Sequence, residues 1–312
     1  MQIEKIVVVT KKTALEELVE RLNSVAQARF YLEQNGVDFR LYEQQHTVYQ
    51  TALKQLRSQL PRALKQQVIE RSMLASYQFS AKDLVVTLGP DGLVINTAKY
   101  LDGQPIIALN PDPSSIDGVL IPFGTSDLAS QIARVERESA SITEISMAKA
   151  TLNDGQQLYA VNDLFIGTRG HASARYELRI DQVSERQSSS GIIISTGAGS
   201  TGWLSSVLTG AWRVASHFTN IEQPQPHPSD LLPSWSDERL WYSVREPFVS
   251  KSSHASLVFG CIEPGRSFSI VSHMPDAGLI FSDGIESDFL SFSSGAIARI
   301  SLAERKAQLV VR

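Results

Sequence analysis

The sequence predicts an α/β domain followed by a β-rich domain, and two observations lead to this fold class. The first is an alternation of buried-strand and helix patterns in roughly the first 125 residues, a βαβ rhythm. The second is a change of pattern from about residue 140, where short alternating segments are separated by turn residues. We therefore expect an open α/β domain over 1–125 and a β sandwich or layered β domain after it.

The α/β part is predicted element by element from its apolar pattern. Residues 3–9 favour a buried first strand. Thr13 and Glu16 have the spacing of a capping box, and apolar residues then recur at helical intervals as far as Val25. The apolar run 84–89 ends in glycine, as is typical of a central parallel strand. The other expected elements are a helix over roughly 47–59, a helix from Gly92 to Tyr100 and a strand over 105–110.

The β-rich part is predicted from short segments that turn residues separate. These segments are 145–152, 156–167, 174–183, 191–196, 254–260, 268–273, 278–284 and 296–302. Residues 218–237 contain four prolines and many polar residues, which indicates an exposed connection or a lid. Asp283-Gly284 favours a turn.

Composition narrows the class of protein. The 312 residues include 29 Lys or Arg and 33 Asp or Glu, so the formal net charge is −4, and hydrophobic residues make up 42%. These values argue against disorder and against a protein held on DNA mainly by bulk positive charge. The single cysteine, Cys261, allows no internal disulfide and no multi-cysteine zinc site. Without a signal-peptide pattern or an apolar stretch of about 18 residues, we expect a cytoplasmic protein with no membrane or nucleic-acid partner.

A first candidate site lies at Gly89-Pro90-Asp91-Gly92, between a buried strand and a helix. In open α/β sheets, ligands bind at the carboxyl ends of strands, and glycines at a helix N-terminus let the backbone approach a phosphate. An aspartate there would repel phosphate, so it would instead orient a nucleophilic hydroxyl, accept its proton or hold Mg²⁺. The alternative is a plain β-turn, for which Pro-Asp-Gly is a strong signal.

A second candidate site is the loop 196–203, which follows the apolar run 192–195. Gly197, Gly199 and Gly202 match the dinucleotide fingerprint G-x-G-x-x-G, which requires a βαβ unit around it. The same loop is rich in hydroxyls and backbone amides, so it could also cradle phosphates and ribose. The alternative without a ligand is a flexible glycine turn.

The serine of this loop allows one further interpretation. Ser200 lies between small residues, as in the nucleophile elbow of hydrolases. Asp230 and then His254 or His273 follow in the chain order Ser, Asp, His. This pattern leaves a hydrolase open beside the phosphate cradle.

The two loops together resemble the NAD kinase family, in particular its mitochondrial-type branch and bacterial relatives. The first loop is similar to the family's GGDGT segment, and 196–203 is similar to its Ser/Thr-rich second loop. Between them, Asn162-Asp163 matches an Asn-Glu pair at the start of a strand. Further matches are Asn110 to Pro113, Arg245-Glu246-Pro247 and 281–300, so the resemblance spans roughly residues 84–305 in the right order.

The resemblance implies a fold and a reaction. The first domain would be Rossmann-like, of the diacylglycerol/NAD-kinase-like type, and would bind nucleotide. It would regain about 295–312, because the family's last strand returns to it. The β-rich domain over 126–294 would bind the dinucleotide and form a homodimer or a higher homo-oligomer. The reaction uses ATP with Mg²⁺ to phosphorylate the adenosine-ribose 2′-hydroxyl of NAD, giving NADP.

By position, the resemblance makes Asp91 the catalytic aspartate. Because a carboxylate is a weak base at neutral pH, it would mainly align the 2′-hydroxyl and accept its proton late. The residues implied in ATP or phosphate binding are Gly89, Gly92, Thr196 and Ser200. Those implied in NAD binding are Asn162, Asp163, Thr201, Gly202, Trp203 and Ser206. No residue is implied as a metal ligand.

Two departures from the family pattern affect the first loop. Pro90 replaces a glycine and removes one backbone N–H, and Leu93 replaces a threonine and removes a hydroxyl. Both changes weaken the ATP side more than the dinucleotide side. Two alternatives therefore stay open: a non-catalytic NAD(P)-binding protein of the same fold, and a related kinase acting on another sugar or lipid hydroxyl. The choices between ATP and polyphosphate as donor, and between NAD and NADH as acceptor, also stay open.

Overall fold

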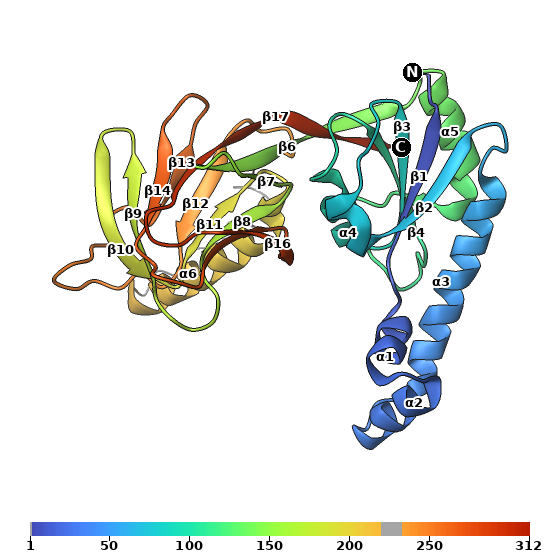
Figure 1. The fold of residues 1–312 in the computed structure, drawn as a ribbon, viewed down its shortest axis with the longest axis horizontal. Helices are drawn as coiled ribbons and strands as arrows, with labels where there is room; N and C mark the ends of the chain where they lie inside the picture. Colours follow the sequence, from blue (N-terminus) through green and yellow to red (C-terminus); the bar gives the residue numbers. More distant parts are fainter. Residues whose placement is uncertain (1, 220–232) are drawn as a thin grey trace. The chain divides into compact units, whose positions relative to one another are not determined.

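The computed structural model describes residues 2–219 and 233–312, which form two compact units (Figure 1). Unit 1 comprises Met1–Thr143 and Gln308–Arg312, and unit 2 comprises Glu144–Ala307. This division agrees in kind with the expected change from an α/β to a β-rich pattern, and each unit has its own hydrophobic core.

The boundaries of the units lie later than the expected positions near 125 and 295. Unit 1 continues past residue 125 because helix α5 (Leu128–Glu136) belongs to it. The buried residues Leu128, Ile132 and Val135 of this helix are part of the core of unit 1. At the second boundary, only the end of the long strand β17 (Ile297–Val311) joins unit 1. There Gln308 and Leu309 pair in parallel with β4.

The sheet of unit 1 is a parallel sheet, as the βαβ rhythm predicted. Strand β4 lies between β3 on one side and β5 and the end of β17 on the other, and β1 and β2 continue the sheet beyond β3. Strands β3 and β4 are buried along their whole length, which explains their continuous apolar runs. The strand bounds are β1 Lys5–Thr10, β2 Lys65–Glu70, β3 Asp83–Leu88, β4 Pro105–Asn110 and β5 Phe123–Gly124.

The helices of unit 1 follow the predicted start signals but not the predicted lengths. The capping box at Thr13 and Glu16 is present at the start of α1. Asn23, with φ of 64°, ends this helix, and Ser24 caps the next one, so Val25 belongs to a second helix that the sequence did not predict. The bounds are α1 Ala14–Leu22, α2 Val25–Gln34, α3 Phe39–Gln59 and α4 Asp91–Ala98, with short 3₁₀ turns at Arg71–Ser76 and Thr125–Asp127.

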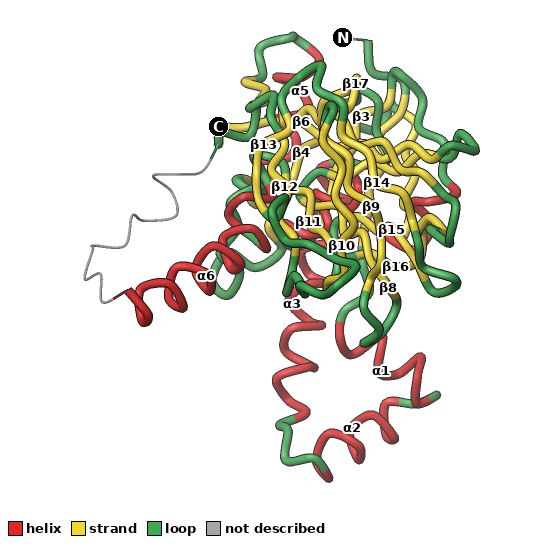
Figure 2. The backbone as a smooth tube through the Cα atoms, turned by 90° about the vertical axis from the view of Figure 1, so that its left-hand side faces the viewer, coloured by secondary structure: helices red, strands yellow, loops and turns green. Residues whose placement is uncertain are grey.

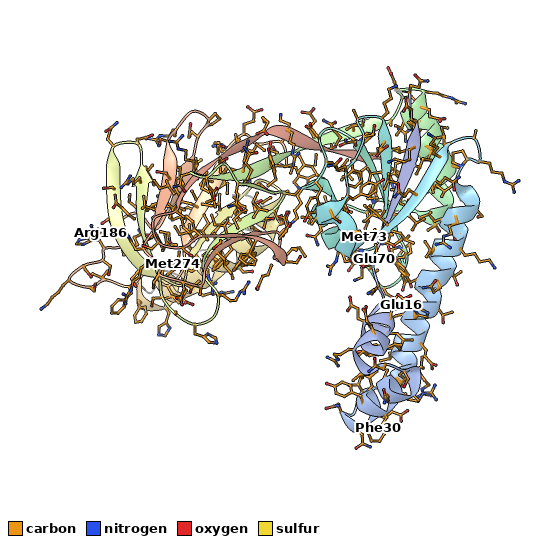
Figure 3. The ribbon with its side chains drawn as sticks, viewed as in Figure 1. Glu16, Phe30, Glu70, Met73, Arg186 and Met274 are labelled. Atoms are coloured by element: carbon orange, nitrogen blue, oxygen red, sulfur yellow. The ribbon has the colours of Figure 1, made fainter. Side chains whose placement is uncertain are left out.

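Helices α1 and α2 and the N-terminal half of α3 extend away from the parallel sheet of unit 1 (Figures 1 and 2). They pack around a small separate cluster whose buried members are Leu15, Ala28, Leu32 and Phe39. Glu16 lies where α1 meets α3, and one of its carboxylate oxygens accepts a hydrogen bond from Gln50 at 3.1 Å (Figure 3). Phe30 on α2 is 65% exposed.

Unit 2 is built from two antiparallel layers, as the turn-separated segments predicted. One sheet has the order β13-β12-β11-β8-β15-β16, and the other contains β10-β9-β14-β17 with β6 and β7 at its side. The bounds in chain order are β6 Ser141–Leu152, β7 Gln157–Ala160, β8 Asp163–Thr168, β9 Ala174–Ile180, β10 Val183–Ser189, β11 Ile192–Ser195, β12 Leu240–Val244, β13 Phe259–Ile262, β14 Phe268–Ser272, β15 Gly278–Ser282 and β16 Ile285–Ser291.

The two layers of unit 2 enclose a common hydrophobic core. Leu164 and Ile194 come from the first sheet, and Leu178 and Ile270 come from the second. Helix α6 (Trp203–Thr219) covers the outer face of the first sheet and was not predicted. The expected connection or lid at 218–237 lies largely outside the described residues. Among residues 2–219 and 233–312, no helix combines the length and the apolar character that crossing a bilayer requires.

A buried ion pair at the start of the parallel sheet gives a stability prediction. Asp83 is 1% exposed, and Lys5 Nζ lies 3.2 Å from its carboxylate. Lys5→Met would leave that carboxylate buried without its cation, so we expect a loss of about 3 kcal/mol in the free energy of unfolding. Lys82→Met is the matched control, because Lys82 pairs with Glu4 in solvent. Urea denaturation measures both; equal effects of the two substitutions would contradict the prediction.

Candidate functional site

The loop after β3 presents few free backbone donors. Gly89 N–H donates to Leu109 O at 3.2 Å, and Leu93 N–H donates to Pro90 O at 2.8 Å. Pro90 has no N–H, and it occupies the N-cap of α4. The amides of Asp91 and Gly92 belong to the first turn of the helix, where N–H groups lack partners within the helix. These two amides are therefore the donors that the loop can offer to an anion.

The Asp91 carboxylate is held in place by a loop that sequence reasoning missed. Val119 N–H donates to one oxygen and Leu120 N–H to the other, each at 3.0 Å. Gly118 allows this close approach, because a Cβ there would lie 3.3 Å from Asp91 Oδ1 and 1.9 Å from Ile121. A carboxylate has about four lone-pair positions, so two stay free to accept from a substrate hydroxyl. The fixed orientation fits an aligning role.

Leu93 belongs to the core of unit 1. Its side chain is 2% exposed, and its Cδ2 lies 2.8 Å from the position that a Cβ on Gly89 would take. The residue at position 93 therefore faces the interior, and the apolar side chain found here fills the space that Gly89 leaves.

Two neighbouring cavities lie at the carboxyl ends of the strands of unit 1. The first, of about 270 Å³, touches the first residues after β1, β3 and β4, namely Lys11, Gly89 and Pro111. The second, of about 380 Å³, lies between α3 and the ends of β4 and β5. This edge of a parallel sheet is where the fold places ligands.

In unit 2, Asp283 fixes the start of β8. Its carboxylate accepts hydrogen bonds from three consecutive backbone amides, Val161 at 3.0 Å, Asn162 at 2.7 Å and Asp163 at 3.2 Å. Its own N–H donates to Asp163 O at 2.9 Å. Asp283 lies in the predicted turn, between β15 and β16, with φ of 53°. The turn is thus also a clamp on the Asn162-Asp163 pair.

The loop that begins at Thr196 is locked onto the same pair. Thr196 N–H donates to Asn162 O at 2.9 Å, and the Thr196 hydroxyl donates to Val161 O at 2.5 Å while accepting from Gly199 N–H at 3.1 Å. A Cβ on Gly199 would lie 2.2 Å from Asn162 O. The structure therefore brings together Asn162, Asp163, Thr196 and Gly199, which are far apart in the chain.

Asp163 is the most unusual titratable group of this cluster. Its side chain is buried, and its Oδ1 has no hydrogen-bond partner within the described residues. Burial raises the pKa of Asp163 to about 7, with a smaller contribution from the charge of Asp283, against a lowering hydrogen bond with Ser195. A buried carboxyl group with an unsatisfied oxygen marks a candidate ligand contact.

The other hydroxyls of the loop are engaged within it. Ser200 is fully buried, and its hydroxyl donates to Gly197 O at 2.6 Å. Ser206 and Thr201 are exposed, and the Ser206 hydroxyl lies 3.4 Å from Gly202 O. Thr196 and Ser200 thus reach a phosphate only through their backbone in this conformation, whereas Thr201 and Ser206 face solvent.

Trp203 packs as part of an apolar cluster. Its ring stacks on Phe165 with centroids 5.6 Å apart and planes 14° apart, beside Ile193 and Leu279. The Arg245 guanidinium lies 5.4 Å from the Trp203 centroid. Arg245 is therefore a cationic group near the loop to which the sequence analysis assigned no role.

The structure does not support the two competing interpretations of this loop. Strand β11 pairs antiparallel with both neighbours, so the glycines are not in the βαβ unit that the dinucleotide fingerprint needs. The buried Ser200 hydroxyl donates to backbone, and no described histidine bonds to it. Asp230 lies outside the described residues. Within 2–219 and 233–312, no three His, Cys, Asp or Glu side chains gather as a metal site.

Comparison with known proteins points in one direction. No family model matches the chain. It is 29% identical over 181 residues to the NAD kinase of Heliobacterium modesticaldum, which is 55% of this chain and 62% of that protein. It is 27% identical over 223 residues to mitochondrial NAD kinase 2 of Rattus norvegicus, 65% of this chain and 48% of that protein. The chain thus spans less than two thirds of either relative.

Solved structures show the same fold. An NAD kinase from Archaeoglobus fulgidus in complex with ATP matches with a TM-score of 0.55 and 15% identity, covering 98% of this chain and 93% of that one. Yeast NADH kinase complexed with NADH matches with a TM-score of 0.57 and 14% identity, covering 100% of this chain and 84% of that one. The predicted fold class and the predicted resemblance to NAD kinases are confirmed.

The contact between Gly199 and Asn162 gives a stability prediction. Gly199→Ala would place a methyl group against the Asn162 carbonyl, in a segment whose three amides are hydrogen-bonded to Asp283. We expect the free energy of unfolding to fall by about 1–3 kcal/mol. Gly210→Ala in α6 is the control, because nothing lies within 4 Å of its added Cβ and alanine favours a helix. Thermal unfolding of both variants measures the effect. A Gly199→Ala protein as stable as wild type would show that the packing of Gly199 on the Asn162 carbonyl does not contribute to stability.

The buried Asp163 gives a pH prediction. Because its folded pKa lies above the unfolded value of 3.8, its contribution to stability is present below pH 4 and is lost as pH rises towards 7. Asp163→Asn has no carboxyl group to ionise at this position, so it does not lose this stability. The free energy of unfolding of the variant minus that of wild type should therefore increase by up to about 4 kcal/mol between pH 4 and pH 8. Asp276→Asn, at an exposed position, is the control. Denaturant titrations at several pH values test it; parallel pH profiles for wild type and Asp163→Asn would contradict it.

Proposed function

We propose that this chain is an NAD kinase, which transfers the γ-phosphoryl group of ATP to the adenosine-ribose 2′-hydroxyl of NAD and releases NADP and ADP. The observation that carries the proposal is the Asp91 carboxylate. Two backbone amides orient it at the carboxyl edge of a parallel sheet, beside a cavity, in a chain with the fold of NAD kinases. The names of the relatives support the same activity.

In phosphoryl transfer, the protein mainly positions the two substrates and stabilises charge. The 2′-oxygen attacks the γ-phosphorus, the bond from that phosphorus to the β,γ-bridging oxygen breaks, and ADP leaves. Asp91 would accept a hydrogen bond from the 2′-hydroxyl through a lone pair that Val119 and Leu120 leave free, and would take the proton late. The amides of Asp91 and Gly92 would meet the phosphates, with Gly89 allowing close approach.

Mg²⁺ would neutralise the triphosphate and polarise the transferring group. In this proposal the ion is held largely by substrate phosphates and water, as is usual for Mg²⁺ at a nucleotide. We propose that ATP and Mg²⁺ bind in unit 1, because the loop with Gly89, Asp91 and Gly92 lies there.

The dinucleotide half of the proposal rests on unit 2. Asn162 and Asp163 would hold adenine and ribose groups, and the unsatisfied Asp163 Oδ1 supports this role. The remaining contacts proposed with NAD are Thr201, Gly202, Trp203 and Ser206. Thr196 and Ser200 would act near the phosphates through their backbone and by keeping the loop in shape. A homo-oligomer formed by unit 2 and a cytoplasmic location complete the proposal.

A second candidate is an NAD(P)-binding protein without turnover. Pro90 favours it, because the phosphate loop loses one amide donor. Leu93 does not, because position 93 faces the core. Calorimetric titration of NAD and of ATP, read beside the NADP assay, separates the candidates: the silent protein binds NAD and makes no NADP, whereas a kinase for another acceptor binds ATP but not NAD.

The kinase proposal predicts the effect of one substitution. Asp91→Asn should lower NADP formation by at least about 100-fold while NAD still binds, because an amide cannot accept the proton. Asp117→Asn is the matched control, since it removes one carboxylate charge at an exposed position of the loop that holds Asp91. The assay supplies ATP, Mg²⁺ and NAD and detects NADP with an NADP-specific dehydrogenase. Near-normal turnover by Asp91→Asn would exclude the assigned role, and a wild type that forms no NADP would overturn the proposal.

A further inference from the structure

We propose that one open sheet face of unit 2 is a docking surface for an acidic segment of another protein. The face belongs to the sheet that contains β10, β9, β14 and β17. The residues that form it lie on other strands than the segments 161–163 and 196–203 of the candidate dinucleotide site. The inference is therefore independent of the proposed kinase activity.

Strand β9 determines which side chains face outward. Tyr176 and Leu178 are buried in the core of unit 2. Arg175, Glu177 and Arg179 alternate with them and therefore point away from the core. Both arginines are exposed, and four residues of extended chain separate them by about 13 Å.

The neighbouring strands add two further arginines to the same face. Arg186 of β10 lies opposite Glu177 in the ladder, on the outer side of the sheet (Figure 3). Arg179 pairs with Ser269 of β14, and Ser269 pairs with Arg299 of β17. Arg186 and Arg299 are exposed as well. We call this surface the arginine face, after Arg175, Arg179, Arg186 and Arg299.

The arginine face carries an excess of positive charge. Glu177 forms an ion pair with Arg179 at 2.7 Å. The hydrogen bond and charge of Arg179, with the charge of Arg186, lower the pKa of Glu177, so it is ionised at neutral pH. Arg175, Arg186 and Arg299 form no ion pair with residues 2–219 and 233–312. Four arginines against one glutamate leave a formal excess of three positive charges.

The centre of the arginine face is aliphatic, which favours a protein as the partner. Val271 of β14 lies opposite Glu177, and Ile297 of β17 lies opposite Val271; both aliphatic side chains are half-buried. Aliphatic residues surrounded by arginines are typical of protein interfaces, whereas nucleic acid is held mainly through its phosphates. The net charge of −4 for the whole chain also disfavours a long polyanion.

The partner would meet the face of the sheet and not its edge. In Figure 2 the strands β10, β9 and β14 lie at the front of unit 2, and no helix covers them. The free edge of β10 is occupied, because Phe248 N–H donates to Ser188 O and His254 N–H donates to Arg186 O. A partner segment therefore contacts outward side chains instead of adding a strand.

The excess charge determines what kind of segment fits. Two copies of the arginine face packed against each other would oppose like charges, so contact between copies of this chain is disfavoured. Guanidinium groups bind carboxylates through two parallel hydrogen bonds. A segment with several Asp or Glu side chains and interspersed aliphatic residues matches both the charge and the aliphatic centre of the face.

The test uses the full-length protein and a fluorescent synthetic peptide of about twelve residues in which glutamate alternates with valine. Fluorescence anisotropy measures its affinity at low salt. A triple variant should bind the peptide at least about 10-fold more weakly, because three carboxylate contacts are lost. This variant combines Arg175→Gln, Arg186→Gln and Arg299→Gln. A matched control removes three exposed arginines of unit 1 and should change the affinity by no more than about 2-fold. The control combines Arg57→Gln, Arg62→Gln and Arg71→Gln.

The outcomes distinguish an acidic protein from other occupants of the face. A wild type that does not bind the peptide, or a triple variant that binds it as well as wild type, overturns the proposal. Arginine-dependent binding of single-stranded DNA or of phosphatidylserine vesicles that is tighter than binding of the peptide also overturns it. So does a wild-type oligomer, measured by sedimentation, that the triple variant no longer forms. NADP formation should be equal in all three proteins, so failure of the kinase proposal leaves this test unaffected.

Discussion

One carboxylate holds the candidate dinucleotide site together. Asp283 accepts hydrogen bonds from the amides of three consecutive residues, 161–163, and so fixes the direction of the chain as it enters β8. Thr196 and Gly199 then pack on the carbonyls of the same segment. The conformation of the loop 196–203 depends on these contacts. The Thr196 and Ser200 hydroxyls are engaged in hydrogen bonds that maintain it.

A carboxylate held by consecutive backbone amides is also found in unit 1, where its role differs. Asp91 is also held by consecutive backbone amides, but its carboxylate keeps lone pairs for a substrate. In unit 2 the residue that holds the backbone and the residue proposed to contact the ligand are different: Asp283 holds the backbone, and Asp163 is buried with one unsatisfied oxygen. A preorganised backbone lets the charged groups act without rearrangement, which is what phosphoryl transfer requires of a protein.

Short sequence patterns predicted part of the fold and of the candidate site. They predicted the capping box at Thr13, the buried strands β3 and β4, and the position of Asp91 between a strand and a helix. The sequence did not predict helix α2, because its apolar residues do not gather on one face: Val25, Phe30 and Tyr31 are exposed, and only Ala28 and Leu32 are buried. The clamp by Asp283 joins residues 121 positions apart, and Asp-Gly alone favours nothing more than a turn.

Hydrogen exchange in the presence of NAD tests the central claim that the interlocked segments of unit 2 form the dinucleotide site. The amides of Asn162 and Asp163 should exchange slowly even without ligand, since Asp283 accepts from both. Added NAD should slow exchange further in peptides that cover 161–163 and 196–203, and the effect should be much weaker in Asp163→Asn. Protection by NAD confined to other parts of the chain, with these two segments unchanged, would contradict the claim.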